Sequence, residues 1–231
     1  MKAGIVVLTG AGISRESGLA TFRDRGGIWS RVRLEDVATP EAFQRDPAGV
    51  QAFYNARRAA LRNPAIAPNG AHRALAKLEQ NYAGEVLIVT QNVDNLHERA
   101  GSSAVLHMHG ALGEARCLRC DAVTTWTDDI TPHSACPACH ATALRPNVVW
   151  FGEMPFHMEL IETALSRCGV FVAIGTSGQV YPAAGFINAV AGRARSYELT
   201  MEPSAVSPLF DRVVHGPATR TVPDLVERLL G

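Results

Sequence analysis

The chain has 231 residues, of which 47% are hydrophobic and 19% charged, a composition typical of a globular protein with one large or two small domains. Its 22 basic and 22 acidic residues balance, so no charge excess supports general binding to nucleic acid or to a membrane surface. The apolar run Ile5–Leu8 is too short for a signal peptide, and no stretch approaches the ~20 apolar residues of a membrane span. We therefore expect a cytoplasmic protein.

Apolar, β-branched runs alternate with helical patterns along most of the chain, as a parallel sheet covered on both faces requires. The expected strands are Ile5–Thr9, Val86–Thr90, Val105–His107, Val148–Trp150, Val170–Gly175, Tyr197–Leu199 and Arg212–Val214. The expected helices are Pro40–Arg45, Val50–Arg62, Gly70–Gln80, Met158–Arg167, Ala183–Ala191 and Asp224–Leu230. This alternation predicts an α/β fold with a doubly wound parallel sheet. Residues 25–68 and 117–144 interrupt it and are expected to form a smaller module packed on the sheet.

A glycine-rich segment, residues 9–14 (TGAGIS), follows the first expected strand directly. Glycines at this place let the backbone approach a phosphate, and the N–H groups at the start of the next helix can bind it. A complete dinucleotide-binding pattern has a third glycine where this chain has Arg15, and no acidic residue ends a second strand to hold ribose hydroxyls. Alone, the segment is equally consistent with a structural strand-to-helix turn.

Four of the five cysteines form two CxxC pairs, Cys117/Cys120 and Cys136/Cys139, with 15 residues between the pairs. Each CxxC turn directs two thiolates toward one centre, and the spacing is that of a zinc ribbon. His133 and His140 lie nearby and can replace one ligand, but four thiolates are the simpler set. A metal with four protein ligands has no open position for water, so the predicted zinc is structural. The fifth cysteine, Cys168, is expected to be core.

Further motifs follow the glycine segment in a fixed order. They are ESG (16–18), TFR (21–23), GIW (27–29), QNVDNLH (91–97), His109-Gly110, the two cysteine pairs, VVWFGE (148–153), GTS (175–177) and EPS (202–204). Together with the segment GAGIS (10–14) they resemble, in the same order, the motifs of the sirtuin family. The resemblance covers nearly the whole chain.

The resemblance implies an NAD-dependent protein-lysine deacylase that releases nicotinamide and O-acyl-ADP-ribose. It implies a Rossmann-like NAD-binding domain (about 1–24, 69–112 and 146–231) and an inserted small domain made of a helical segment (25–68) and a zinc ribbon (113–145). NAD is then the co-substrate, one zinc ion is structural, and acyl-lysine proteins are the partners. We expect a monomer with no membrane or direct nucleic-acid partner.

A base that works near neutral pH is best supplied by histidine, whose unperturbed pKa lies close to neutrality. His109 matches the catalytic position of the family. Chemistry alone does not separate it from His107, two residues earlier; only the family match does. His97 is expected to be structural or to orient other groups.

By resemblance, a larger set of residues surrounds NAD. It comprises Gly10, Ala11, Gly12, Ser14, Phe22, Arg23, Gln91, Asn92, Asp94, Gly175, Thr176, Ser177, Thr200, Glu202 and Ala218. The side chains of Asn92 and Asp94 can donate to and accept from the nicotinamide carboxamide, whereas Phe22 suits the cover of the reacting sugar and Arg23 the pyrophosphate. The resemblance also implies that an extended substrate peptide pairs with backbone, by β-strand addition. The residues expected on either side of the peptide are Val149, Phe151, Gly152, Val180 and Tyr181.

Tyr54 and Arg57 lie three residues apart in an expected helix, so both can meet one ligand. A phenol beside a guanidinium suits a carboxylate, and the pair resembles that of sirtuins that remove succinyl, malonyl or glutaryl groups. Ala38 matches a small residue that leaves room for the longer acyl chain. We predict activity on acetyl as well as on acidic acyl groups. The alternative is an amphipathic helix in which Arg57 and Arg58 simply face water.

Three positions depart from the family pattern: Arg15 replaces a small residue, Ala20 a frequent proline, and Thr200 an asparagine that contacts the adenosine ribose. These departures bear on the affinity for NAD more than on the reaction type. Three other functions remain open from the sequence. They are ADP-ribosyl transfer to protein, nucleic-acid binding by the zinc ribbon, and hydride transfer by a dehydrogenase, which the incomplete glycine pattern alone supports.

Overall fold

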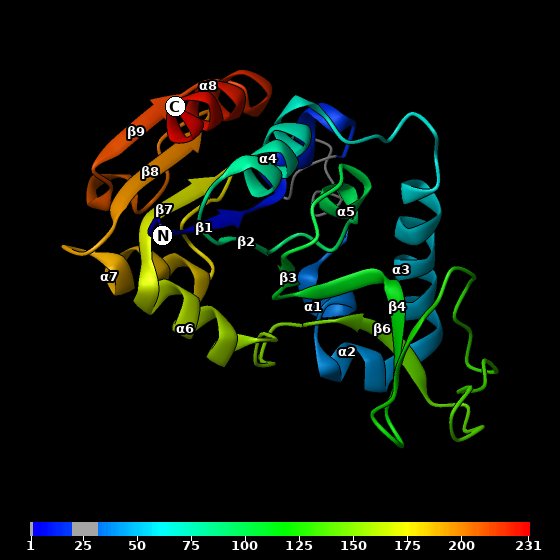
Figure 1. Ribbon diagram of the computed structural model, residues 1–231. Coiled ribbons are helices and arrows are strands. Elements are labelled where there is room, and N and C mark those ends of the chain that lie inside the picture. The colour runs from blue at the N-terminus through cyan, green and yellow to red at the C-terminus, as the bar shows by residue number, and fades with distance from the viewer. Residues whose placement is uncertain (1, 20–31) are drawn as a thin grey trace.

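A computed structural model describes residues 2–19 and 32–231, with the backbone alone at position 34. Within these residues, six strands form a parallel sheet in the order β3-β2-β1-β7-β8-β9 (Figure 1). Their bounds are β1 Gly4–Thr9, β2 Val86–Thr90, β3 Val105–His107, β7 Cys168–Ile174, β8 Arg195–Thr200 and β9 Arg212–His215. The strand order reverses beside β1, so the expected doubly wound α/β fold is confirmed.

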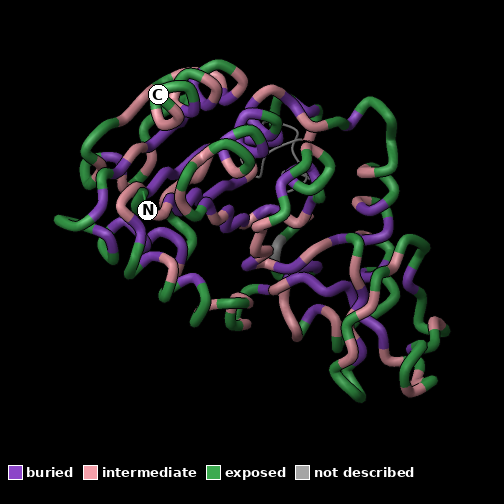
Figure 2. The backbone as a smooth tube through the Cα atoms, viewed as in Figure 1, coloured by how far each residue is buried: buried purple, intermediate pink, exposed green. Residues whose placement is uncertain are grey.

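Helices cover both faces of this sheet. α4 (Gly70–Asn81) and α8 (Ala218–Leu230) lie on one face, and α6 (Met158–Arg167) and α7 (Phe186–Val190) lie on the other (Figure 1). Successive β1 residues alternate between the two cores, Ile5 and Val7 on the first face and Val6 and Leu8 on the second. Figure 2 shows buried residues along these strands. Burial of each such side chain stabilises the fold by about 1.5–3 kcal/mol.

A second sheet lies beside the first and is antiparallel, in the order β5-β4-β6. Its strands are β4 Gly110–Cys117, β5 Val123–Thr125 and β6 Leu144–Val148, and it packs near α1 (Leu34–Val37), α2 (Pro40–Arg45) and α3 (Pro47–Leu61). The expected strand Val148–Trp150 is therefore wrong in its bounds and in its sheet. The sequence of β6, LRPNV, shows no apolar pattern because two of its buried residues are polar. Arg145 pairs with Glu153 and Asn147 pairs with Glu114, and this pairing lets both side chains be buried.

Other boundaries differ for identifiable reasons. α3 begins three residues before Val50, because the Asp46 carboxylate accepts from the N–H of Gly49 and Pro47 suits the first helical position. α8 begins at Ala218 rather than Asp224 and continues through Pro223, which alone suggests a helix start. The segment expected as the helix Ala183–Ala191 is a 3-10 turn followed by α7.

Three short elements lie among the loops near the sheet edge. They are the 3-10 helices η1 (Ala11–Ser17) and η4 (Ser207–Leu209) and the helix α5 (Leu96–Arg99), which contains His97. Among residues 2–19 and 32–231, no helix is both long enough and apolar enough to cross a membrane.

Candidate active site

The residues expected to act on NAD come from loops at the carboxyl edge of the parallel sheet. At its centre the loops after β1 and β7 touch through glycines: the N–H of Gly12 donates to the carbonyl of Gly175 at 3.0 Å. A Cβ added to Gly12 would stand 2.6 Å from the Cα of Gly175, and one added to Gly10 would stand 2.8 Å from the Gly175 carbonyl oxygen. These glycines are therefore required by contact between two backbones of the protein itself, whatever else they bind.

A buried polar network joins the loops after β1 and β2. The Ser14 hydroxyl donates to Asp94 at 3.0 Å, and the Asn92 amide donates to the Ser14 hydroxyl and to the Gly10 carbonyl, both at 3.2 Å. Burial raises the pKa of Asp94, although the Leu96 N–H and the Ser14 hydroxyl lower it. Four of the expected site residues, Gly10, Ser14, Asn92 and Asp94, are thus brought together.

Two buried histidines support this network from beneath. His72, on α4, accepts from the backbone N–H of Asn69, so its Nε2 carries the proton toward the Ser14 hydroxyl at 3.5 Å. His97 contacts the Thr9 hydroxyl at 3.0 Å, and its ring lies 5.0 Å from that of His72. Burial lowers the pKa of His72 to about 4 and that of His97 to about 3, so both rings are neutral. No sequence motif indicated His72, which stands in an expected helix.

The two histidines at the end of β3 have different surroundings. Nδ1 of His109 lies 3.1 Å from the carbonyl of Gln91, so Nδ1 carries the proton and Nε2 keeps a free lone pair. Burial lowers the pKa of His109, and the Gln91 carbonyl opposes this only in part. Burial lowers the pKa of His107 too, but the hydrogen bond to Glu98 at 2.6 Å, the charge of Glu98 and the hydrogen bond to the Asn92 carbonyl together outweigh it and raise that pKa. His109 is thus the better neutral base, whereas His107 is paired with an acid.

The segment that follows β6 connects His109 with the residues expected to bind the acyl group. The backbone N–H of Val149 donates to the His109 carbonyl at 2.9 Å, and that of Phe151 donates to the Ala38 carbonyl at 3.0 Å. Between them, the Trp150 indole N–H donates to the Tyr54 hydroxyl at 3.0 Å. Residues 149–151 therefore connect the expected base, His109, with the expected acyl-binding residues Ala38 and Tyr54.

Tyr54 and Arg57 lie on one side of α3, as their spacing predicts. Tyr54 is buried, and this burial raises the pKa of its phenol, which therefore remains a hydrogen-bond donor at neutral pH. Arg57 is half-buried, with its guanidinium 5.7 Å from the centre of the Phe53 ring. Burial lowers its pKa, whereas Tyr54 and Asp94 raise it. In the described part of the chain no carboxylate forms an ion pair with Arg57. Arg58, by contrast, is buried and does not face water.

Trp150 is held by Arg145 and Glu153, and no sequence motif indicated Arg145. Arg145 lies over the Trp150 ring, with its guanidinium carbon 3.4 Å from the ring centre, and it pairs with Glu153 at 2.6 Å. Glu153 also accepts from the backbone N–H of Trp150 at 2.8 Å. The motif VVWFGE contained two of these residues, but nothing in the sequence marked Arg145 as their partner.

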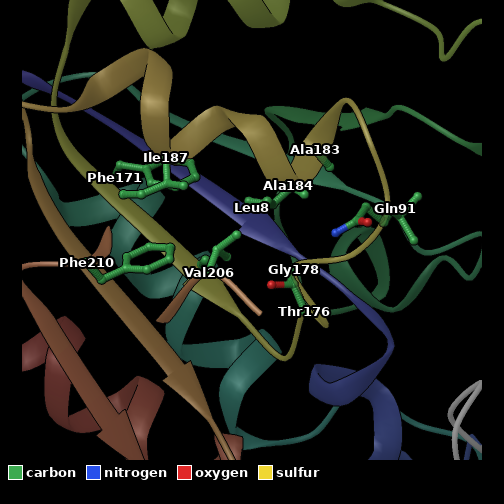
Figure 3. A pocket seen from close by; sticks show the side chains of 12 residues that line it. Leu8, Gln91, Phe171, Thr176, Gly178, Ala183, Ala184, Ile187, Val206 and Phe210 are labelled. Atoms are coloured by element: carbon green, nitrogen blue, oxygen red, sulfur yellow. The ribbon is translucent and has the colours of Figure 1, made fainter. Parts of the chain in front are cut away.

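On the opposite side, a loop after β7 carries Gly175, Thr176 and Ser177. Beneath it a narrow cleft of about 10 Å³ runs from Gln91 and Thr176 to Phe171 (Figure 3). That volume holds about one water molecule. The Ser177 hydroxyl accepts from the N–H of Gln179 at 3.3 Å.

At the end of β8, Thr200, which is expected to contact adenosine, bonds to backbone groups of the protein itself. The Thr200 hydroxyl donates to the Glu202 carbonyl at 2.7 Å, and the Thr200 carbonyl accepts from the N–H of Gly216 at 3.0 Å. Ala218 begins α8, with its side chain in the core. Buried Glu198, which no motif indicated, accepts from the Ser207 hydroxyl and anchors the loop after Thr200.

The expected peptide-binding residues are accessible. Phe151 is 55% exposed and Tyr181 71% exposed, which is unusual for aromatic side chains, and Val180 is also exposed. Tyr181 forms one wall of an open groove of about 410 Å³ between α6 and α7. Phe22 and Arg23, also expected at NAD, lie outside the described residues.

The four cysteines of the CxxC pairs form one cluster, with all Sγ atoms within 4.8 Å of one another. The Sγ atoms of Cys117 and Cys139 are 3.6 Å apart, and those of Cys120 and Cys136 are 3.8 Å apart. Zinc–sulfur bonds of ~2.3 Å in a tetrahedron place the sulfurs roughly 3.8 Å apart, so the cluster fits zinc. His133 and His140 do not belong to it.

Comparison with known proteins gives consistent results. The profile of the Sir2 family matches residues 10–182. An NAD-dependent protein deacylase of Shigella flexneri is 56% identical over 99% of this chain and 85% of its own length. One of Bdellovibrio bacteriovorus is 54% identical over 98% of this chain and 96% of its own. A solved Sir2 homologue in complex with NAD, 38% identical, superposes with a TM-score of 0.88 over 98% of this chain and 89% of that one.

Proposed function

The chain belongs to the Sir2 family, and on this premise we propose that it removes acetyl, succinyl and malonyl groups from protein lysines. It is an NAD-dependent protein deacylase, as its relatives are named across nearly the whole length of the chain. The observation that carries the acyl specificity is Arg57, a half-buried cation beside Tyr54 to which the described residues supply no carboxylate partner.

NAD supplies the reaction with a sugar carbon that the acyl oxygen attacks as nicotinamide leaves. The protein contributes a neutral base: because Nδ1 of His109 is held by the Gln91 carbonyl, Nε2 can take a proton from a ribose hydroxyl. The depressed pKa of His109 keeps this nitrogen unprotonated at neutral pH. Asn92 and Asp94, fixed through Ser14, are suited to orient the nicotinamide amide.

Burial disfavours the charged form of Arg57, and an incoming carboxylate relieves that cost. Arg57 can bind a carboxylate through two N–H groups, and Tyr54, which accepts from Trp150, can donate its own hydroxyl proton to the same ligand. The small Ala38 leaves space beside them. An acetyl group makes neither polar contact, so it gains no binding energy from the pair but is not repelled by it.

The test is the rate of deacylation of matched acetyl-, succinyl- and malonyl-lysine peptides with NAD, measured for the wild type, His109→Ala and Arg57→Met. We expect the wild type to act on all three and His109→Ala to lose activity on all three. Arg57→Met should lose most of its kcat/KM on the acidic peptides and keep part of its activity on the acetyl peptide.

Equal losses by Arg57→Met on every peptide would contradict the role given to Arg57. Mass spectrometry of the products separates the second reaction type. Transfer of ADP-ribose to protein without any free lysine peptide would replace deacylation by ADP-ribosyl transfer.

We also propose the following organisation. Residues 1–24, 69–112 and 146–231 form the NAD-binding domain, and residues 25–68 and 113–145 form the small domain. The side chain of Asn55 donates to the Ile130 carbonyl and accepts from the Ile130 N–H, which supports the helical segment and the zinc ribbon as one unit. The protein works as a monomer in the cytoplasm, without direct nucleic-acid binding, a location that suits four thiolates held as metal ligands.

A further inference from the structure

Helix α3 carries a second polar face, adjacent to the one with Tyr54 and Arg57. Gln51, Asn55 and Arg58 recur at intervals of four and three residues and so share one side of the helix. Consecutive residues project about 100° apart around a helix, which separates Arg58 from Arg57. All three side chains of this second face are buried, with exposed fractions of 3%, 9% and 4%.

The first two of these side chains bind the backbone of other segments. The Gln51 amide donates to the Leu144 carbonyl at 2.9 Å. The Asn55 amide donates to the Ile130 carbonyl at 2.8 Å, and its oxygen accepts from the Ile130 N–H at 2.9 Å. Asn55 therefore bonds to both backbone groups of Ile130, a residue of the loop between the CxxC pairs.

Arg58 completes the set. Its Nε donates to the Leu112 carbonyl at 2.7 Å, and its Nη1 donates to the Asn55 side chain at 2.8 Å. Leu112 lies on β4 and Leu144 begins β6, so the three side chains bind both long strands of the small sheet and a loop of the zinc-binding segment. Figure 1 shows α3 alongside β4 and these loops. We call Gln51, Asn55 and Arg58 the α3 anchor.

The α3 anchor fixes the rotation of the helix about its own axis. The surface of a helix lies about 6 Å from the axis, so a rotation of roughly 10° displaces a side-chain tip by about 1 Å. A misplacement of that size can cost up to about 100-fold where two groups must meet a ligand in a defined geometry. Recognition of a carboxylate by Arg57 and Tyr54 has this requirement, whereas an acetyl group makes no such contact.

We propose that Gln51, Asn55 and Arg58 are positioning residues that set the preference for acidic acyl groups by holding the rotation of α3 against the small sheet. This inference rests on the proposed role of Tyr54 and Arg57 in binding the acyl carboxylate. Selectivity then depends on residues that never touch the substrate, and the zinc-binding segment acts on it through its backbone.

The experiment compares Asn55→Ala and Gln51→Leu with the wild type, with Arg57→Met as the reference for lost carboxylate recognition. Ser196→Ala is the matched control, because the buried Ser196 hydroxyl both donates to and accepts from Asp211, at 2.9 Å each, on the far side of the main sheet. The readouts are kcat/KM on succinyl and acetyl peptides, and the affinity for the succinyl peptide without NAD.

We expect Asn55→Ala to lower the succinyl-to-acetyl ratio of kcat/KM by about 10-fold, mainly through KM, and to weaken succinyl-peptide binding by a similar factor. Gln51→Leu should lower the ratio by about 3-fold, since it removes one neutral hydrogen bond, and it carries the test if Asn55→Ala does not fold. Ser196→Ala should leave the ratio unchanged.

Two results would overturn the inference: an unchanged ratio in both anchor variants, or an equal change in the Ser196→Ala control. In either case a lowered ratio in Arg57→Met leaves the proposed function standing. If Arg57→Met itself keeps the wild-type ratio, the proposed acyl specificity fails first, and the inference fails with it.

Discussion

The carboxyl edge of the parallel sheet and the side of α3 that carries Tyr54 and Arg57 are built in different ways. The sheet edge depends on backbone contact between Gly12 and Gly175 and on a network of buried hydroxyl, amide and carboxylate groups. The α3 side depends on side chains of one helix, which is attached to the small sheet by polar bonds.

Under the proposed function, this difference assigns the reaction to the sheet edge and the choice of acyl group to the α3 side. A backbone contact admits no larger residue, and a buried network loses its function when one member is removed. Side chains on a helix face can change one at a time without disturbing the sheet. We therefore expect substitutions at the sheet edge to abolish activity on every substrate and substitutions on the α3 side to change the choice among substrates.

The largest effect is expected for Gly12→Ala. Its Cβ would stand 2.6 Å from the Cα of Gly175, so the two loops must separate. We expect the free energy of unfolding to fall by about 3 kcal/mol, and deacylation of acetyl and succinyl peptides to be lost together. Urea unfolding and peptide assays measure both. The control is Gly113→Ala, where a Cβ meets nothing within 4 Å. Near-normal activity of Gly12→Ala would remove the contrast between the two regions.

Acidification should weaken the sheet edge through His72 and His97. Their folded pKa values of about 4 and about 3 lie below the usual 6.5, so the unfolded chain takes up protons first. The stability that the two neutral rings contribute is fully present above pH 6.5 and falls as the pH drops below that value. At pH 5 each histidine costs about 2 kcal/mol of stability relative to pH 7.

The His97→Gln variant isolates this effect, because glutamine keeps an N–H donor for Thr9 and does not titrate. Urea unfolding measures the free energy of unfolding at pH 7 and at pH 5. Its decrease between the two should be about 2 kcal/mol smaller in His97→Gln than in the wild type. An identical decrease would mean that the neutral state of His97 does not stabilise this region.

On the α3 side, Trp150→Phe tests the hydrogen bond from the Trp150 indole to the Tyr54 hydroxyl. Phenylalanine keeps an aromatic ring beside Phe43 but removes the N–H donated to the Tyr54 hydroxyl. We expect kcat/KM on the succinyl peptide to fall by about 5-fold, the value of one hydrogen bond, and that on the acetyl peptide to fall less. Trp126→Phe is the matched control, since no described residue accepts from its buried indole N–H. Equal losses on both peptides would show that Trp150 acts on every substrate, as is expected of residues at the sheet edge.

The smallest effect is expected for Thr200→Asn. The Thr200 hydroxyl is directed to the Glu202 carbonyl, whereas the asparagine of the family contacts the adenosine ribose. The KM for NAD should fall by about 3-fold, as one additional hydrogen bond implies, with the ratio of succinyl to acetyl activity unchanged. A change in that ratio would show that the two regions are coupled.

Strands of the parallel sheet and the cysteine cluster were predictable because their signals are local. β2 and β3 have the expected bounds, and the CxxC pairs meet as their spacing predicts. β4 and β5 were not expected, since charged residues such as Glu114 and Arg116 alternate with small ones and pair only across the sheet. The strand expected at Val148–Trp150 was misplaced for the same reason.

The sequence indicated which residues to expect at the site, whereas the contacts that hold them together could be predicted only in part. Family motifs indicated His109, Asn92 and Asp94, but not that the glycines serve a contact between two loops. Neither His72 beneath Ser14 nor Arg145 over Trp150 was indicated. Such partners are distant in sequence, and their roles follow from the fold rather than from any local pattern.

The position of β1 in the middle of the sheet has a consequence for synthesis on the ribosome. Ile5 pairs with Val86 on one side and with Val170 on the other, 165 residues later. At ~5–20 residues per second, the second partner emerges on the order of 10–30 s after the first strand. The four cysteines emerge in between and can bind their metal before the sheet is complete. During that interval the apolar residues 5–8, buried in the finished protein, lack one neighbouring strand, so we expect cellular yield to depend on how well the nascent β1 segment is shielded.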